Sequence, residues 1–246
     1  MSNTATKGIL YIIPNTLGKT PENNTIPEYV LNVIRNLEYF VVENIQQSVK
    51  YLQWVGETVP DYKIEFYPLD DKVDKIEKAN YVKPLRAGKN VGLLSDAGLP
   101  AVADPGHEIV RMAHQMGAQV VPLVGPSSIM LALMASGLGG QQFAFHGYLP
   151  RNDKGRRDRI NELEKSLRLN HQTQIFMEAP HRNLAVYNTV LDACRDTTWF
   201  CIATNLTLPG EEIVSQPIEE WRKKKNPPQI KKKPAIFILW DPTISG

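Results

Sequence analysis

The sequence has few cysteines, almost no net charge and no long apolar run. Cys194 and Cys201 are its only cysteines, so a disulfide framework or a cysteine-only zinc site has too few members. A formal net charge of +2 over 246 residues supplies no bulk attraction for a polyanionic partner. No apolar run approaches the ~20 residues that a membrane-spanning helix needs. We therefore expect a cytoplasmic protein without a membrane partner.

Two short signals are also missing. The opening residues, MSNTATKGILYIIPN, lack the basic region and following apolar stretch that mark a secretion signal. No GxxxxGK[ST] motif occurs, and no GxGxxG follows a predicted strand, so the common phosphate-binding loops are absent. The sequence therefore does not predict a nucleotide held through its phosphates by such a loop.

Short apolar runs alternate with helical periods along the whole chain. In the first half we expect strands at 8–13, 39–42, 63–67, 91–94 and 119–124, with helices at 27–37, 46–56, 73–88 and 105–117. In the second half we expect strands at 143–145, 173–177, 199–204 and 235–240, with helices at 126–136, 151–169, 182–194 and 218–225. This order predicts an α/β protein of two domains, 1–124 and 125–246, with mixed, mainly parallel sheets.

The loop after the fourth expected strand, SDAGLPAVADPG (95–106), has an unusual composition. Loops at the carboxyl ends of parallel strands are where α/β sheets bind ligands. Gly98 removes side-chain bulk, while Asp96 and Asp104 add negative charge, with no Lys or Arg between residues 90 and 110. Such a loop suits a ligand that carries hydroxyl groups or a positive charge. An ordinary structural turn is the alternative.

A second loop, in VVPLVGPSSIMLALMASG (120–137), joins a strand end to a helix of small residues. Ser127 and Ser128 stand at the start of that helix. They either cap the helix or donate hydrogen bonds to a ligand in the same cleft.

Four segments in order resemble the signatures of the tetrapyrrole methylase family. They are SDAGLPAVADPG (95–106), VPLVGPSSIMLALMASGL (121–138), FAFHGYLPR (143–151) and IFMEAPHR (175–182). Within the family the chain is most similar to the branch that includes the small-subunit ribosomal RNA cytidine 2′-O-methyltransferase. The resemblance implies the tetrapyrrole methylase fold, S-adenosyl-L-methionine bound in an interdomain cleft, and a homodimer.

Carried over position by position, the resemblance implies a set of cofactor-binding residues. They are Pro14, Asp96, Ala97, Gly98, Leu99, Val102, Ser127, Ser128, Met177, Leu206, Pro234 and Ala235. A sulfonium is a fixed cation, so small side chains, backbone amides and carboxylates suit it, whereas basic residues would repel it. Methyl transfer is an in-line displacement whose chief demand is positioning.

The departures from the branch fall on its substrate signatures. Where the branch carries an AED-T-R-type motif, this chain has VENIQQS (42–48), with Asn44 in the aspartate position and no arginine. Where the branch has Arg-Glu-Leu-Thr-Lys before a His-Glu pair, this chain reads TNLTL (204–208) and then PGEE (209–212). The sequence therefore supports a methyltransferase better than it supports ribosomal RNA as the substrate.

The acceptor side offers Glu178 and His181 as candidate catalytic residues. An oxygen acceptor must lose its proton, and either side chain within hydrogen-bond reach could take it. Arg182 follows them as a further residue on this side. The alternative is that the Glu-x-x-His pattern supplies only a helix cap and a salt bridge. No third ligand accompanies the pair, so we expect no metal.

Two basic clusters bear on the partner. The first holds Arg151, Lys154, Arg156, Arg157 and Arg159, and the second holds Arg222, Lys223, Lys224, Lys225, Lys231, Lys232 and Lys233. They either form solvated surface or bind RNA phosphates.

Three hypotheses follow. The chain is an S-adenosylmethionine-dependent methyltransferase of ribosomal RNA, acting on the ribose 2′-oxygen of a cytidine in the RNA or the small ribosomal subunit. Alternatively, it methylates a small molecule such as a tetrapyrrole. In the third, it is a non-catalytic relative that binds cofactor or RNA.

Overall fold

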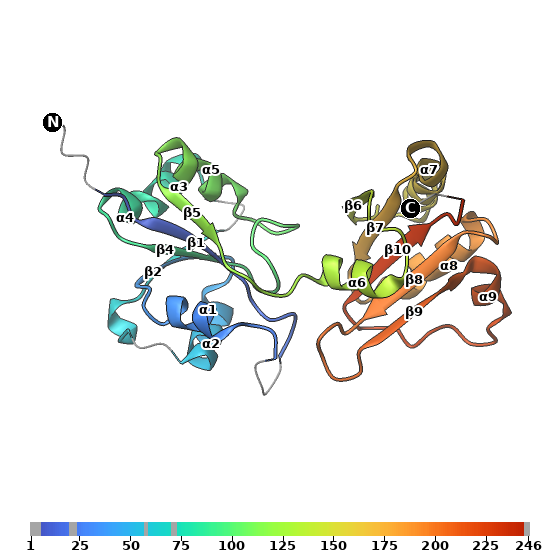
Figure 1. The fold of residues 1–246 in the computed structure, drawn as a ribbon, viewed down its shortest axis with the longest axis horizontal. Helices are drawn as coiled ribbons and strands as arrows, with labels where there is room; N and C mark the ends of the chain where they lie inside the picture. The colour runs from blue at the N-terminus through green and yellow to red at the C-terminus, as the bar shows by residue number, and fades with distance from the viewer. Residues whose placement is uncertain (1–5, 20–23, 57–58, 70–72, 244–246) are drawn as a thin grey trace. The chain divides into compact units, whose positions relative to one another are not determined.

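The computed structural model describes residues 6–19, 24–56, 59–69 and 73–243. Residues 1–5, part of the segment inspected for a secretion signal, lie outside the described residues. The chain divides into two compact units, Met1–Ser127 and Ser128–Gly246 (Figure 1). Within the described ranges, no helix combines the length and the apolar character that crossing a membrane requires.

The first unit contains a five-stranded parallel sheet. Its strands are β1 (Ile9–Ile13), β2 (Tyr39–Val42), β3 (Glu65–Pro68), β4 (Val91–Leu94) and β5 (Gln119–Pro122), in the order β3-β2-β4-β1-β5. Every neighbouring pair is parallel. The carboxyl ends of β1, β4 and β5 therefore meet at one edge, which is where ligands bind in sheets of this kind.

Helices cover both faces of this sheet, as Figure 1 shows. One face packs on α1 (Glu28–Ile34) and α2 (Ile45–Val55), and the other on α3 (Lys75–Tyr81), α4 (Lys83–Arg86) and α5 (His107–Gln115). The helix expected at 73–88 is thus two helices that meet at Val82. The break follows from Pro84, since its ring disfavours helical geometry in the preceding turn.

The second unit has a mixed sheet with four helices among its described residues. Its strands are β6 (Phe143–Tyr148), β7 (Thr173–Glu178), β8 (Trp199–Thr204), β9 (Glu212–Pro217) and β10 (Ala235–Trp240), in the order β6-β7-β10-β8-β9. Its helices are α6 (Ser128–Ser136), α7 (Asp153–Asn170), α8 (Asn183–Ala193) and α9 (Ile218–Lys223). Only the β6–β7 pairing described here is parallel. The two-domain α/β prediction is confirmed, although the parallel character belongs chiefly to the first sheet.

Strand β9 was not predicted. It reads EIVSQP and lies at the edge of the sheet, where one glutamate is exposed and the remaining residues are only half-buried. An edge strand needs few apolar residues, because its pairing with β8 uses backbone groups.

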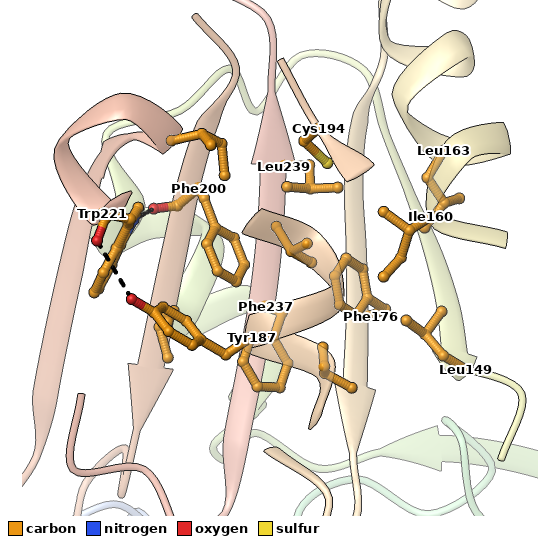
Figure 2. Packing of buried hydrophobic residues seen from close by; sticks show 14 of the residues in the cluster. Leu149, Ile160, Leu163, Phe176, Tyr187, Cys194, Phe200, Trp221, Phe237 and Leu239 are labelled. Atoms are coloured by element: carbon orange, nitrogen blue, oxygen red, sulfur yellow. Dashed lines mark hydrogen bonds between the residues drawn. The ribbon is translucent and has the colours of Figure 1, made fainter. Parts of the chain in front are cut away.

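Aromatic residues fill the core of the second unit. Phe176, Phe237 and Phe200 come from three adjacent strands, and neighbouring ring centroids lie 5.6 and 6.0 Å apart (Figure 2). The indole Nε1 of buried Trp221 donates to the carbonyl oxygen of Phe200 at 2.9 Å, and the Tyr187 hydroxyl reaches the carbonyl of Trp221. These contacts fix α8 and α9 on the strands whose ends carry the predicted site residues.

Candidate functional site

In the first unit, the turn after β1 is joined to the loop after β4. The backbone N–H of Asn15 donates to the carbonyl oxygen of Gly98 at 2.8 Å. The Asn15 side-chain amide donates to the carbonyl oxygens of Ser95 and Asp96 at 3.0 and 3.1 Å. Because Asn15 is buried, it holds the two loops in a fixed relation.

The loop at 95–106 has an unusual backbone. Gly98, Ala101 and Ala103 have φ angles of 68°, 64° and 63°, and Gly106 has a φ of 126°. Left-handed alanines are strained by about 1–2 kcal/mol each. Strain of this kind persists where surrounding structure imposes it, often at ligand sites.

Three carboxylates gather beside this loop: Glu43, Asp96 and Asp104. The backbone N–H of Asp96 donates to Glu43 Oε2 at 3.2 Å. The pKa of Asp104 is raised to about 6, first by burial and then by the negative charges of Glu43 and Asp96. A hydrogen bond with Ser95 opposes this shift. Partial desolvation of its carboxyl and the charge of Glu43 also raise the pKa of Asp96. No ion pair found within the described ranges neutralises these carboxylates, so the site favours a cation.

The predicted cofactor residues of the first unit lie around this loop and the strand ends beside it. They are Pro14, Asp96, Ala97, Gly98, Leu99, Val102 and Ser127, of which Pro14 and Gly98 are buried and Asp96, Ala97 and Val102 are exposed. A Cβ added at Gly125 would stand 2.1 Å from the Cβ of Pro14, so the turn after β5 packs directly on the turn after β1.

The predicted cofactor residues of the second unit lie in part at one end of its sheet. Ala235 pairs with Glu178 on one side and Thr204 on the other, and Ile236 pairs with Met177. Met177, Leu206, Pro234 and Ala235 therefore share that end, where the backbone N–H of Asn205 donates to the Pro234 carbonyl oxygen at 3.1 Å. Ser128 begins α6. The predicted cofactor residues thus form two groups, one in each unit.

The candidate catalytic residues differ in environment. The Glu178 side chain is buried, and its Oε1 accepts from the Ala179 N–H at 2.7 Å and from Arg182. Its Oε2 has no hydrogen-bond partner among the described residues, like Arg182 Nη1 and Asn183 Oδ1. His181 is exposed.

The second basic cluster is tied to the same loop. The Asn183 side-chain amide donates to the carbonyl oxygens of Ile230 and Lys233 at 2.9 and 2.8 Å. The Lys232 N–H donates to the Pro180 carbonyl at 3.0 Å. Lys231 and Lys232 are exposed beside the end of β7. Sequence reasoning missed Asn15 and Asn183; the one local signal was an asparagine in the turn after a strand or at a helix start.

Most guanidinium groups of the two clusters already have partners. Arg156 pairs with Asp153, Arg157 with Asp192, Arg159 with Glu162, and Arg222 with Asp196.

Within the described parts of the chain, no group of three or more His, Cys, Asp or Glu side chains could hold a metal ion.

Comparison with known proteins identifies the family. The model of the tetrapyrrole (corrin/porphyrin) methylases matches residues 24–221. The chain belongs to the tetrapyrrole methylase family. It is therefore a methyltransferase, and S-adenosylmethionine is its methyl donor.

Several known proteins resemble the chain over most of its length. It is 32% identical to the ribosomal RNA small subunit methyltransferase I of Vibrio cholerae, over 86% of this chain and 69% of that protein. It is 31% identical to the protein of the same name from Bacillus subtilis, over 94% and 75%. The crystal structure of diphthine synthase matches with a TM-score of 0.65 at 12% identity, covering 96% of this chain and 91% of that one.

The first unit fits such a methyl donor. Its loop combines unpaired carboxylates with Gly98, where even a Cβ would touch Leu17 at 3.4 Å. Such a loop would offer negative charge to the sulfonium and backbone groups to the nucleoside, and residues 90–110 contain no Lys or Arg that would oppose them.

Proposed function

We propose that the chain methylates ribosomal RNA, at the ribose 2′-oxygen of a cytidine, in the RNA or the small subunit. The observation that carries the proposal is its 28–32% identity with several proteins named ribosomal RNA small subunit methyltransferase I, over 86–94% of its length. The atom and the base come from the resemblance to that branch.

The cofactor residues are part of this proposal. Pro14, Asp96, Ala97, Gly98, Leu99, Val102 and Ser127 contact the methyl donor from the first unit, and Ser128, Met177, Leu206, Pro234 and Ala235 from the second. The two clusters of strand ends described above support this assignment. The methyl donor supplies an activated methyl group, and the residues supply alignment.

We assign proton removal from the 2′-hydroxyl to His181 and a supporting role to Glu178. His181 is exposed, so its ring can meet a macromolecular substrate. The Glu178 carboxylate is buried and engaged with Arg182, which suits holding the loop in place. Imidazole is the commonest proton acceptor near neutral pH.

RNA would be held partly by Lys231 and Lys232. Hydrogen bonds with Asn183 and Pro180 fix the backbone of the lysine segment beside His181. The side chains of Lys231 and Lys232 are exposed. Phosphate contacts of this kind weaken as salt concentration rises.

A small-molecule acceptor is the second candidate. One observation favours it: Asn44, in the position where the branch has aspartate, caps α2 by accepting from the Gln47 N–H at 3.1 Å. Asparagine keeps the capping role and loses the charge, so this departure is compatible with the fold and removes a substrate signature.

We also propose that the protein acts as a homodimer in the cytoplasm. Exposed apolar side chains support an interface: Met130 and Met134 on α6, and Phe143 and Tyr148 on the edge strand β6. Sedimentation at several protein concentrations tests it, and a monomer at every concentration refutes it.

Labelled S-adenosylmethionine tests the function directly. The purified chain is incubated with it and with small ribosomal subunits or free ribosomal RNA. Label in a ribose 2′-oxygen of a cytidine supports the proposal, and label in a small tetrapyrrole alone supports the second candidate. Absence of turnover despite cofactor binding supports the non-catalytic alternative.

A matched pair of variants tests the cofactor loop in the same preparation. Gly98→Val puts a branched side chain at a φ of 68°, and Gly56→Val does so at a φ of 73° in a helix cap away from the loop. At about 100 times its Kd the cofactor stabilises the wild type by ~2.7 kcal/mol. We expect this shift to disappear only in Gly98→Val.

A further inference from the structure

A pocket of about 360 Å³ opens in the first unit next to the end of β1. Its lining includes Lys19, Gln47, Lys50, Tyr51, Trp54 and Asp96. All of these residues belong to one compact unit. Its size lies within the range of small-ligand sites, and none of the proposed cofactor residues except Asp96 lines it.

One wall of the pocket is aromatic. Tyr51 and Trp54 stand three residues apart on α2, and their rings stack with centroids 5.7 Å apart and an interplanar angle of 24°. Tyr51 is buried, and its hydroxyl donates to the Pro14 carbonyl oxygen at 2.7 Å. Trp54 is half-buried. A partly exposed indole with a fixed ring behind it forms a rigid stacking surface.

The rest of the lining is polar and carries both charges. Lys19 and Lys50 are exposed, and no ion pair found in the described part of the chain engages either one. Asp96 contributes a carboxylate, and Gln47 an amide. A flat surface, two free cations and an acceptor match the base, the phosphates and the amino group of a nucleotide.

The pocket is also linked to the proposed cofactor loop. Asn15, another lining residue, donates to the carbonyl oxygens of Asp96 and Gly98. A base in the pocket would therefore lie next to the loop that is assigned to the methyl donor.

We propose that this pocket binds one nucleotide of single-stranded RNA, with its base on the Trp54 ring and the two phosphates that flank its ribose on Lys19 and Lys50. The Asp96 carboxylate accepts a hydrogen bond from the exocyclic amino group, as carboxylates do from cytosine N4. The inference rests on the proposed function for the choice of RNA.

The test measures binding of a fluorescein-labelled oligocytidylate to the full chain by anisotropy at low salt. Trp54→Leu should weaken binding about tenfold, whereas Trp54→Phe, which keeps a ring, should stay within about threefold of the wild type. Lys19→Ala/Lys50→Ala should weaken binding and reduce the salt slope by roughly 1.4, the contribution of two phosphates on a single strand. Lys83→Ala, an exposed lysine of α4 on the opposite face of the sheet, serves as control and should change neither quantity.

Three results would overturn the proposal. They are unchanged binding in both Trp54→Leu and the double lysine variant, an equal loss in Lys83→Ala, and displacement of the oligonucleotide by S-adenosylhomocysteine, which would make the pocket a cofactor site. The double variant alters only exposed side chains, so it remains informative where Trp54→Leu fails to fold.

The methylation assay separates this inference from the function. If the oligonucleotide binds as described and no ribosomal RNA is methylated, the proposed function fails and the pocket stands. If Trp54→Leu and the double lysine variant both methylate ribosomal RNA and bind the oligonucleotide as well as the wild type, the pocket fails and the function stands.

Discussion

Asp104, in the loop after β4, makes the stability of the folded protein depend on pH. Its folded pKa is raised to about 6, chiefly by burial, above an unfolded value of about 3.9. The stability that it contributes is fully present below the unfolded pKa and is lost as pH rises through 6. We expect the stability of the wild type relative to Asp104→Asn to fall between about pH 4 and pH 7, measured by urea unfolding.

Protonation of Asp104, which favours folding, should have the opposite effect on cofactor binding. Loss of the Asp104 charge below about pH 6 should weaken binding of the sulfonium in the wild type and leave Asp104→Asn insensitive in this range. Asp158→Asn, an exposed carboxylate of α7, is the control. A pH dependence that is the same in wild type and Asp104→Asn would contradict this account.

His181 gives a second prediction about a single residue. Because the side chain is exposed, His181→Asn should leave the free energy of unfolding within about 0.5 kcal/mol. If it removes the proton from the acceptor, methyl transfer should slow by about 100-fold or more while cofactor affinity stays constant. His114→Asn, another exposed histidine, should do neither. Normal turnover in His181→Asn would leave it without a catalytic role.

Single residues also mark the limits of sequence reasoning. Asn15 bonds to groups 80 and 81 residues away, and Asn183 to groups 47 and 50 residues away. No local pattern contains such partners, so neither asparagine could be recognised as the residue that joins two loops. Glu178 was recognised, but its burial and its contact with Arg182 depend on the packed structure.

Among elements, the sequence predicted every described strand except β9. The run VGLL of β4 fits a fully buried strand, whereas β9, EIVSQP, shows neither an apolar run nor strict alternation and lies at an edge. The direction of β10 relative to its neighbours β7 and β8 was not predicted either, because the distance along the chain allows parallel or antiparallel pairing. That direction decides which residues meet: in an antiparallel pairing Ala235, the first residue of β10, stands beside Glu178, the last residue of β7.

The attachment of α9 to its sheet gives a prediction at this scale. Trp221 is buried and donates its indole N–H to the Phe200 carbonyl oxygen, so Trp221→Phe removes a buried hydrogen bond and ring volume. We expect a loss of about 1–3 kcal/mol in urea unfolding. Trp240 is the matched control, because its buried Nε1 has no partner among the described residues. Trp240→Phe should be less destabilising; an equal loss would mean that the hydrogen bond contributes nothing.

For the whole molecule, the alternation of strands and helices predicted two α/β halves, and four short signatures identified the family. What the sequence left open is which acceptor the protein uses, since the altered residues at 42–48 and 204–212 are those of the substrate signatures. The structure adds that Asn44 and Asn205 have local roles, one as a helix cap and one in a left-handed turn. Such roles explain why these residues fit the fold without the charges of the branch.

The assignment of cofactor residues to both units makes a prediction about the molecule as a whole. If one ligand contacts both groups, it must slow local opening in both, because only the closed conformations bind it. We expect S-adenosylmethionine to lower amide hydrogen exchange in 95–102 of the first unit and in 204–207 and 235–236 of the second. Gly98→Val should abolish protection in all three segments, including the two that lie far from the substitution in sequence. Protection confined to 95–102 would remove Met177, Leu206, Pro234 and Ala235 from the cofactor site, since a ligand held by one unit stabilises only that unit.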